Sequence, residues 1–575
     1  MMRGMMQRAT RSLSAVLAAL VLATPVAAQV VTGTVTDSAS GQPIPGAVIQ
    51  LLDQTGEARG RGLSDIRGVF AVRATGTVSS VRVVRIGFRP SVTAITALPA
   101  TGLRLDVAMT RIPAFLDPVR VLAAQCNSRR NRGRSPVALI EQARAGLLAS
   151  VLTREQNPAA MTRLIFERTF AEDARAAGRA ADGQPDQAPE RQHVYRDSAT
   201  QQTQSFRSAR QAAAFVNDGF YSEVDGTAVF DAPDADVLLD DAFAAGYCFR
   251  VMPRDRSRPR EVGLGFEPAT RRDGRVDVEG ALWIDTVARE LRRLEFEYLG
   301  LNRQVELRRP GGSIDFRTLV NGLVIVERWQ LRLIGAAADT LPYGPEGSFR
   351  VRYRYFDVHS GGELASAEWS DGTTWRATLG TATGRVSLRD GTPAAGVTLL
   401  LTDTPYHAST DSAGNFRIPD LLPGTYRVAV NDEALRSIGL SVPTTYRVVT
   451  ARDSTHLRVT MPSRADVIAD GCRGPGPFDP NSRAFVLGRA LRTDGSPIEQ
   501  AMWDVRINTP EGWMDFATNG RTGSDGLMPL CSGLRRGLEI EITARSPEGL
   551  VDVQRRRLTE DATIIPFVFP LPTTP

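Results

Sequence analysis

The chain has 575 residues, with 69 basic and 64 acidic side chains and a formal net charge of +5. Lysine is absent, so every one of these basic side chains is an arginine. This excludes a P-loop lysine, a Schiff-base lysine and the S-x-x-K nucleophile of penicillin-binding proteins. The near balance of charge gives no reason to expect nucleic acid as a partner, and the length accommodates three or four domains.

The first 28 residues have the pattern of a secretory signal peptide. Arg3, Arg8 and Arg11 precede an apolar run over residues 13–22, and Val26-Ala27-Ala28 supplies small residues for cleavage. The alternative is a membrane anchor, but the run is shorter than the ~20 residues that span a bilayer. We therefore expect an exported chain in the periplasm, at the outer membrane or outside the cell. No transmembrane segment is expected after cleavage.

Residues 30–112 contain a weaker copy of a strand-and-turn pattern that is clearest in residues 383–430. There, Val386 and Leu388 alternate with polar residues as in a half-buried strand, and an apolar run covers residues 397–401. Turn sequences separate the strands: D-G-T-P at 390–393, T-D-S-A-G at 410–414 and P-G at 423–424. The order of signals predicts a small β-sandwich. Residues 484–573 carry a third, degraded copy, with Gly523 and Met528 where the others have Asp and Phe.

These motifs, G-x-V, G-x-P-x-x-G-V, T-D-x-x-G-x-F and L-P-G-x-Y, resemble the carboxypeptidase regulatory-like family. The resemblance covers residues 30–110 and 381–462, and more weakly 484–573. It implies seven-stranded sandwiches of the prealbumin-like and starch-binding-like type. In that family the module accompanies enzymes, transporters and adhesins without being catalytic, so it predicts fold and says little about activity.

Between the first two sandwiches, residues 120–378 predict an α+β domain. Ser135-Pro136 caps a helix whose apolar stripe runs to about Arg154, and a second helix is expected over residues 236–245. An alternating strand is expected at Leu164–Arg168, and a flexible loop over residues 171–191. Period-two alternation then predicts a meander of six or seven strands, with one apolar and one charged face. The expected strands are 263–266, 275–284, 290–298, 304–308, 313–319, 323–333 and 349–358.

A curved sheet covered by helices resembles, in pattern only, the half-barrel of periplasmic lipoprotein carriers. The stretches at 281–285, 294–298 and 321–329 are also similar to uncharacterised secreted bacterial proteins. The fold prediction is therefore a mainly β, multi-domain chain in which β-sandwich modules flank a central domain with an antiparallel meander sheet. Its predicted parts are 1–28, 30–112, 120–378, 381–462 and 484–573.

Four cysteines in an exported chain suggest two disulfides. Three pairings are open, and we favour Cys126 with Cys248 and Cys472 with Cys531, because each pair then lies in one predicted domain. Zinc is the competing interpretation. The absence of C-x-x-C and the scattered histidines argue against it, so no metal or other cofactor is expected.

Carboxylates are the remaining catalytic candidates. Asp285, Glu295 and Glu297 lie on adjacent predicted strands and could form a glycosidase pair. The preferred interpretation is a charged row paired with Arg292 and Arg293. An acidic cluster (Asp231, Asp234, Asp236, Asp240, Asp241) could hold calcium, but it lacks EF-hand spacing, and a helix N-terminal cap is preferred.

The sequence thus predicts a non-enzymatic cell-envelope protein that is structural or binds carbohydrate or protein. A carrier of a lipid or other apolar ligand and a glycoside hydrolase are the alternatives. The partner is not identified; a glycan, a lipid and an envelope protein are all open. Aromatic side chains of the central domain are candidates for lining a pocket, with ordinary core packing as the alternative for each. They are Trp283, Tyr298, Trp329, Tyr353 and Tyr355.

Overall fold

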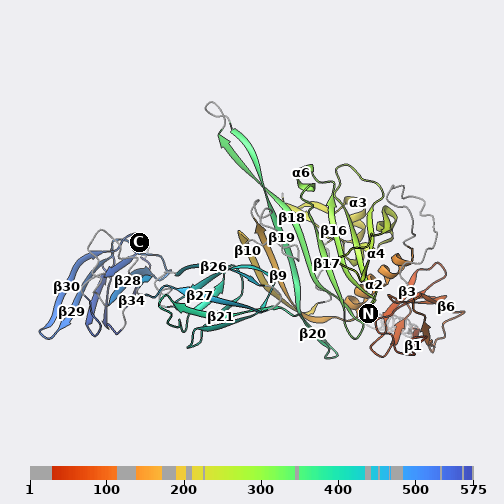
Figure 1. Ribbon diagram of the computed structural model, residues 1–575, viewed down its shortest axis with the longest axis horizontal. Coiled ribbons are helices and arrows are strands. Elements are labelled where there is room, and N and C mark those ends of the chain that lie inside the picture. The colour runs from red at the N-terminus through yellow and green to blue at the C-terminus, as the bar shows by residue number, and fades with distance from the viewer. Residues whose placement is uncertain are drawn as a thin grey trace, which may run out of the picture. The chain divides into compact units, whose positions relative to one another are not determined.

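The computed structural model of the chain describes residues 29–112, 137–170, 189–202, 210–224, 227–342, 349–433, 442–450, 454–464, 466–467, 484–530, 534–559 and 562–572. The fold is mostly β, in several separate sheets, as predicted (Figure 1). The predicted signal peptide, the Ser135-Pro136 helix cap and most of the predicted 171–191 loop lie outside the described residues. The predicted five-part domain division stays a prediction.

The chain divides into two compact units. The first comprises residues 1–163, 197–334 and 359–376, and the second comprises residues 164–196, 335–358 and 377–575.

The first segment is a sandwich of two sheets. One sheet has the order β4-β1-β7, with β8 also on β1, and the other has the order β3-β2-β5-β6. Val35, Leu51, Phe70 and Val83 come from both sheets and share one buried core. The strands are β1 (Val30–Asp37), β2 (Val48–Leu52), β3 (Ala58–Leu63), β4 (Val69–Arg73), β5 (Ser80–Val84), β6 (Ser91–Ala94), β7 (Leu103–Arg104) and β8 (Val107–Met109).

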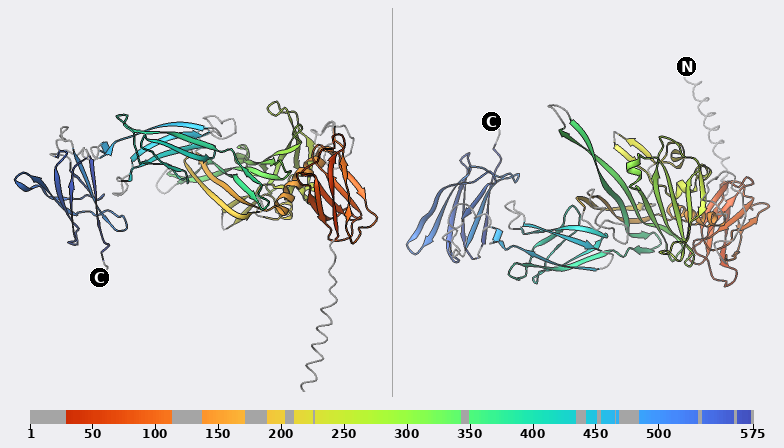
Figure 2. Two further views of the ribbon diagram at one scale, coloured as in Figure 1. Left: turned by 90° about the horizontal axis from the view of Figure 1, so that it is seen from below. Right: turned by 45° about the horizontal axis from the view of Figure 1, so that its top comes forward.

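Two later segments repeat this strand order. The second has sheets β24-β21-β27 and β23-β22-β25-β26, and the third has β31-β28-β34 and β30-β29-β32-β33. In all three, the first strand pairs antiparallel with the fourth and parallel with the last. The blue strands of the third segment form one body in both views of Figure 2.

The strands of the second segment are β21 (Gly380–Leu388), β22 (Thr398–Leu401), β23 (His407–Ser409), β24 (Asn415–Leu421), β25 (Gly424–Asn431), β26 (Val442–Thr450) and β27 (Ser454–Met461). Those of the third are β28 (Phe485–Arg492), β29 (Met502–Thr509), β30 (Gly512–Arg521), β31 (Leu527–Leu530), β32 (Glu539–Arg545), β33 (Val551–Arg557) and β34 (Ala562–Phe569).

A buried hydroxyl holds the same turn in each sandwich. Thr410 Oγ1 donates to the Ala394 carbonyl at 2.7 Å and accepts from the Val397 N–H at 3.1 Å. Ser64 and Thr522 make the equivalent pair of bonds in the other two sandwiches. The third copy has lost the turn Asp but keeps this hydroxyl, because burial of two backbone polar groups requires a partner for each.

The central sheet has the order β10-β9-β19-β18-β17-β16-β15-β14-β13, with β20 on β19. The predicted meander is confirmed as β14 to β19. Three strands that were not part of the predicted meander extend this sheet, β13 beyond β14 and β9 and β10 beyond β19. The strands are β9 (Ala159–Phe170), β10 (Arg191–Gln202), β13 (Tyr247–Val251), β14 (Glu261–Pro268), β15 (Asp277–Asp285), β16 (Glu290–Leu299), β17 (Gly311–Thr318), β18 (Val324–Pro342), β19 (Phe349–Trp369) and β20 (Thr374–Arg376).

Two predictions for this region are wrong in detail. The strand expected at 304–308 is the short helix α6 (Arg303–Glu306), which starts because Asn302 Oδ1 accepts the Val305 N–H at 3.0 Å. The single helix expected at 236–245 is two, α4 (Ala235–Leu239) and α5 (Asp241–Gly246). Asp240 separates them, because its extended backbone ends one helix and its carboxylate caps the next.

Helices cover the apolar face of the sheet within the first unit (Figure 1). They are α2 (Val137–Gln156), α3 (Ala212–Asp218), α4 and α5, and the short hairpin β11 (Tyr221–Val224) and β12 (Thr227–Phe230) adjoins them in the chain. Helix α2 also packs on β2 and β3, so it joins the first sandwich to the central sheet. A Cβ on Gly146 would lie 2.8 Å from Ile86 of the sandwich and 2.9 Å from Leu291 of β16. Only glycine allows this approach.

Candidate functional site

The carboxylates considered for a glycosidase lie on β15 and β16, and each has a structural partner. Asp285 Oδ1 accepts two backbone N–H groups of the β15–β16 turn, both at 2.8 Å, and its Oδ2 lies 3.5 Å from Arg292. Glu297 lies 2.6 Å from Arg309. Asp285 therefore stabilises the β15–β16 turn, and Glu297 is held in an ion pair near the end of β16.

Glu295 is held from several sides. Arg258 donates to both of its oxygens, at 2.5 and 2.9 Å, Trp283 Nε1 donates at 3.0 Å, and Arg293 lies 3.6 Å away. Burial raises the pKa of Glu295, but the Arg258 hydrogen bonds and charge outweigh it, so the pKa is lowered. A general acid needs the opposite shift. The preferred interpretation, a charged row paired with Arg292 and Arg293, holds for Asp285 with Arg292 and for Glu295 with Arg293. It is wrong for Glu297, which pairs with Arg309, and it missed Arg258 as the nearest partner of Glu295.

The acidic cluster caps helices, as preferred from the sequence. Asp234 Oδ1 accepts the Val237 N–H at 3.1 Å at the start of α4, and Asp240 caps α5. Asp236 forms an ion pair with Arg154 at 2.7 Å. Over the described ranges, no group of three or more His, Cys, Asp or Glu side chains could hold a metal ion.

The five aromatic candidates divide between the two units. In the first, Trp283, Tyr298 and Trp329 are buried, and the Tyr298 hydroxyl donates to a backbone carbonyl at 2.7 Å. In the second, Tyr353 is 61% exposed and Tyr355 is half-buried. Their role as ligand-lining residues stays a prediction.

Of the four cysteines, the described residues include Cys248 alone. It lies in β13, is buried and is not a free thiol. Cys126, Cys472 and Cys531 lie outside the described residues, so both proposed pairings stay predictions.

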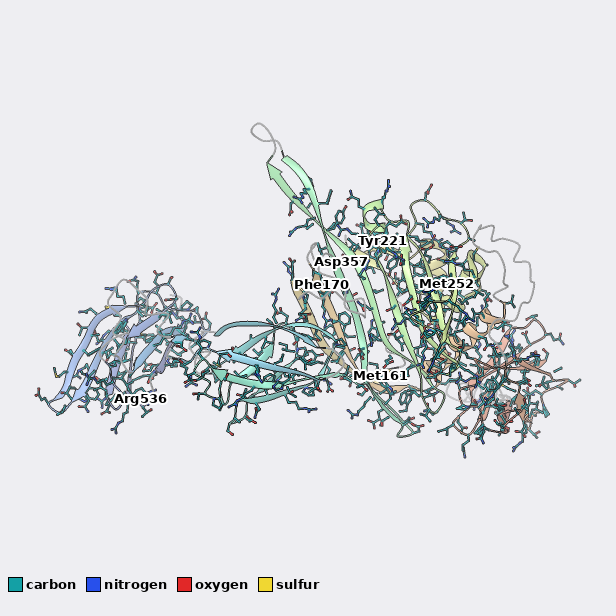
Figure 3. The ribbon with its side chains drawn as sticks, viewed as in Figure 1. Met161, Phe170, Tyr221, Met252, Asp357 and Arg536 are labelled. Carbon is teal, nitrogen blue, oxygen red and sulfur yellow. The ribbon has the colours of Figure 1, made fainter. Side chains whose placement is uncertain are left out.

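An open cleft of about 230 Å³ lies in the first unit, where β9 and β10 meet the β19–β20 hairpin. Trp375 lines the cleft and packs with Met161 and Ala367 in a small apolar core; Figure 3 labels Met161. The hairpin is anchored because Trp369 Nε1 donates to the Asn157 carbonyl at 3.1 Å. The lining residues are Ala160, Met161, Thr162, Ser198, Ser366, Ala367, Glu368, Thr374, Trp375 and Arg376.

The polar side chains that the β19–β20 hairpin contributes to this cleft have no side-chain partners among the described residues. Among the described residues, Glu368 and Arg376 form no ion pair or side-chain hydrogen bond, and neither do Ser366 and Thr374. Both charged side chains are exposed. This contrasts with the central sheet, where Asp285, Glu295 and Glu297 are all paired. Sequence analysis missed the site, although the Asp371-Gly372 turn between two short alternating runs was a usable hairpin signal.

A second polar cluster on β18 and β19 is buried. Glu363 is 2% exposed, and burial raises its pKa to about 7 although Arg328 Nε, 3.4 Å away, acts in the opposite direction. His359 is also buried, and its ring nitrogen lies 3.1 Å from Gln330 Nε2. From the raised pKa of Glu363 we expect the stability of this region to depend on pH.

The sheet orders and turns define a protein in which β-sandwich modules accompany a helix-covered central sheet. Residues 30–110 and 381–462 are carboxypeptidase regulatory-like domains, since both match the family of that description. The resemblance expected from the turn motifs is thereby confirmed for these two stretches. No curated protein matches the chain in sequence. No helix of the described residues is long and apolar enough to cross a membrane.

Solved structures give only slight likenesses. A mutant type II cohesin–X-dockerin complex from Acetivibrio cellulolyticus has 23% identity over 14% of this chain and 56% of that chain, with a TM-score of 0.12. The TIE protein of Bacillus anthracis has 10% identity over 60% and 63%, with a TM-score of 0.15. BcpA, the major pilin subunit of Bacillus cereus, has 8% identity over 94% and 98%, with a TM-score of 0.12. TM-scores this low support no inference about function. The match to the cohesin–X-dockerin complex covers little more than half of that chain.

Proposed function

We propose that the chain is an exported, non-catalytic binding protein of the cell envelope, whose ligand occupies the cleft between β9, β10 and β20. The ligand is a glycan or a segment of an envelope protein. The observation that supports this proposal is that the charged side chains of the cleft have no partners in the described parts of the chain, whereas the carboxylates of the central sheet do. Glu368 and Arg376 line the cleft and form no ion pair or side-chain hydrogen bond among the described residues, whereas Asp285, Glu295 and Glu297 serve a turn and ion pairs. A concave pocket with a few available polar groups is a typical ligand site.

A non-catalytic role fits both the modules and the central sheet. Carboxypeptidase regulatory-like domains accompany other activities without carrying them, as the resemblance implies. A retaining or inverting glycosidase needs two carboxyl groups in distinct environments flanking the scissile bond. The partners of Asp285, Glu295 and Glu297 leave none of the three in that role.

A lipid carrier requires open space between sheet and helices. In the described residues of that layer, aromatic rings pack on one another: Phe215 on Phe220 at 4.9 Å and Phe243 on Tyr247 at 3.9 Å between ring centroids. Tyr298 of β16 contacts Phe230 at 5.2 Å. These contacts favour a packed core there and the cleft as the binding site.

The test is co-sedimentation of the purified full chain with isolated cell envelopes. Trp375→Ala is expected to weaken binding at least about tenfold, because truncating a central aromatic of an interface typically costs 2 kcal/mol or more. The control is Trp513→Ala, which truncates a half-buried tryptophan of the third sandwich. Equal binding by Trp375→Ala and wild type would refute the cleft as the binding site.

A further inference from the structure

We infer that the outer edge of β33, in the third sandwich, is a docking site for an extended acidic segment of a partner protein, which adds to the sheet as a further strand. The edge belongs to the second unit, whereas the cleft belongs to the first. The inference therefore goes beyond the proposed function and does not rest on it.

Strand β33 is a regular sheet edge. Among the described strands it pairs with β32 alone, and its seven residues pair without a register shift. The strands at the same place in the other two sandwiches differ, because β6 has four residues and β26 shifts its register against β25. At the opposite edge of the third sandwich, the register of β30 against β29 shifts twice. Short strands and bulges discourage strand addition, and β33 has neither feature.

The register also shows which backbone groups of β33 are available. Just after the strand, the Leu558 N–H donates to the Leu538 carbonyl at 2.8 Å. Hydrogen-bonded and non-hydrogen-bonded pairs alternate along an antiparallel ladder, so the N–H and C=O groups of the odd-numbered residues of β33 point away from β32. Arg556 Nη1 donates to one of these carbonyls, that of Arg555, at 2.8 Å. No other strand of the described structure pairs with this edge.

The side chains of the same odd-numbered residues share the outer face of the sheet. The even-numbered side chains point inward, since Gln554 Nε2 donates to a backbone carbonyl of β34, in the other sheet, at 2.8 Å. On the outer face Val551 is 49% exposed and Val553 is 51% exposed, and Arg555 and Arg557 follow them. An added strand would therefore place its side chains beside two valines and then two arginines.

This row of side chains fits an acidic partner. Arg557 is exposed and forms no ion pair or side-chain hydrogen bond within the described residues. Arg555 shares its carboxylate partner, Glu541 at 2.6 Å, with Arg506. An antiparallel partner would present two acidic side chains opposite the arginines, followed by two apolar side chains opposite the valines. A second copy of β33 has no carboxylate on this face, and charged side chains at an edge oppose self-pairing.

The probe is a short capped peptide in which Thr alternates with Glu, Glu, Val and Val, in that order, titrated into the full chain by fluorescence anisotropy. It should bind, and binding should weaken as salt is added because exposed charges are screened. A peptide with Lys in place of both Glu residues should bind at least about tenfold more weakly, because like charges then face each other. Arg557→Gln should weaken binding of the Glu peptide about two- to fivefold.

N-methylation tests the backbone ladder without changing the protein. Methyl groups on the Glu and Val amides, which would face β33, should weaken binding at least about tenfold, whereas methyl groups on the Thr amides, which would face away, should change it less than about threefold. In the protein, Val553→Pro removes an outward N–H and should weaken binding at least about tenfold. That N–H makes no bond to β32, so thermal unfolding of this variant should stay close to that of wild type.

Several results would overturn the inference. Absence of binding by the Glu peptide, or equal binding by the two methylated peptides, would show that no strand is added. Equal binding by the Glu and Lys peptides would show that the partner is not acidic. A dimer of the full chain that Val553→Pro dissociates, detected by analytical ultracentrifugation, would show that a second copy occupies the edge.

Discussion

Replacing Glu363 by Gln should change how the stability of the first unit depends on pH. The carboxyl is 2% exposed, and burial raises its pKa to about 7 from 4.5. The folded state therefore keeps this proton to a higher pH than the unfolded state does. Stability is greatest below about pH 4.5 and falls as the pH rises to about 7, where an ionised carboxylate must stay buried.

The size of the effect follows from the shift. A pKa difference of about 2.5 units corresponds to about 3 kcal/mol in the free energy of unfolding. Glu363→Gln keeps the shape and removes the titration, and Arg328 retains Asp315 at 3.8 Å. The variant should match wild type near about pH 4 and exceed it by up to about 3 kcal/mol near about pH 8.

Urea unfolding at both pH values, with hydrogen exchange of β18 and β19 peptides to locate the change, measures this difference. Glu368→Gln is the matched control, since it removes an exposed carboxylate from the same strand, and its difference from wild type should be the same at both pH values. A wild-type protein that gains stability relative to Glu363→Gln between the two pH values would show that the reasoning about burial is wrong.

Three further substitutions test packing, each by thermal or urea unfolding. Thr410→Val should destabilise the second sandwich by about 2–3 kcal/mol, because it leaves two buried backbone groups unpaired, whereas exposed Thr378→Val should be near neutral. Gly146→Ala should cost about 1–3 kcal/mol through overpacking between Ile86 and Leu291, against little change for Gly246→Ala, where a Cβ has open space. Arg168→Met should cost about 2–4 kcal/mol, because this buried guanidinium donates to the Pro423 carbonyl at 2.9 Å and to the Tyr426 hydroxyl at 3.1 Å. A cost within error of its control would contradict either of the first two predictions, and a cost below about 1 kcal/mol would contradict the third.

The sequence was most informative where local chemistry decides structure. Turn residues at matching offsets predicted the sandwiches, and the positive φ of Gly46 and Gly396 shows why glycine recurs there; Gln500 adopts the same conformation in the third copy. Alternation predicted the meander. It failed at residues 304–308, because a four-residue helix set by an Asn cap is indistinguishable from a short alternating run.

The cleft could not be predicted from residue types alone. Glu368 and Arg376 are ordinary residue types, and what distinguishes them is that they form no ion pair or side-chain hydrogen bond within the described structure. Likewise, the apolar stripe of α2 predicted one buried face. The helix is buried on several sides because it lies between the first sandwich and the central sheet.

By itself, the sequence determined the kinds of strands and turns, because each depends on residues within a few positions of one another. Only the tertiary structure decided which charges are paired and which remain available. Pairing depends on residues such as Arg258 and Glu295, which lie far apart in the chain and meet only when the strands align.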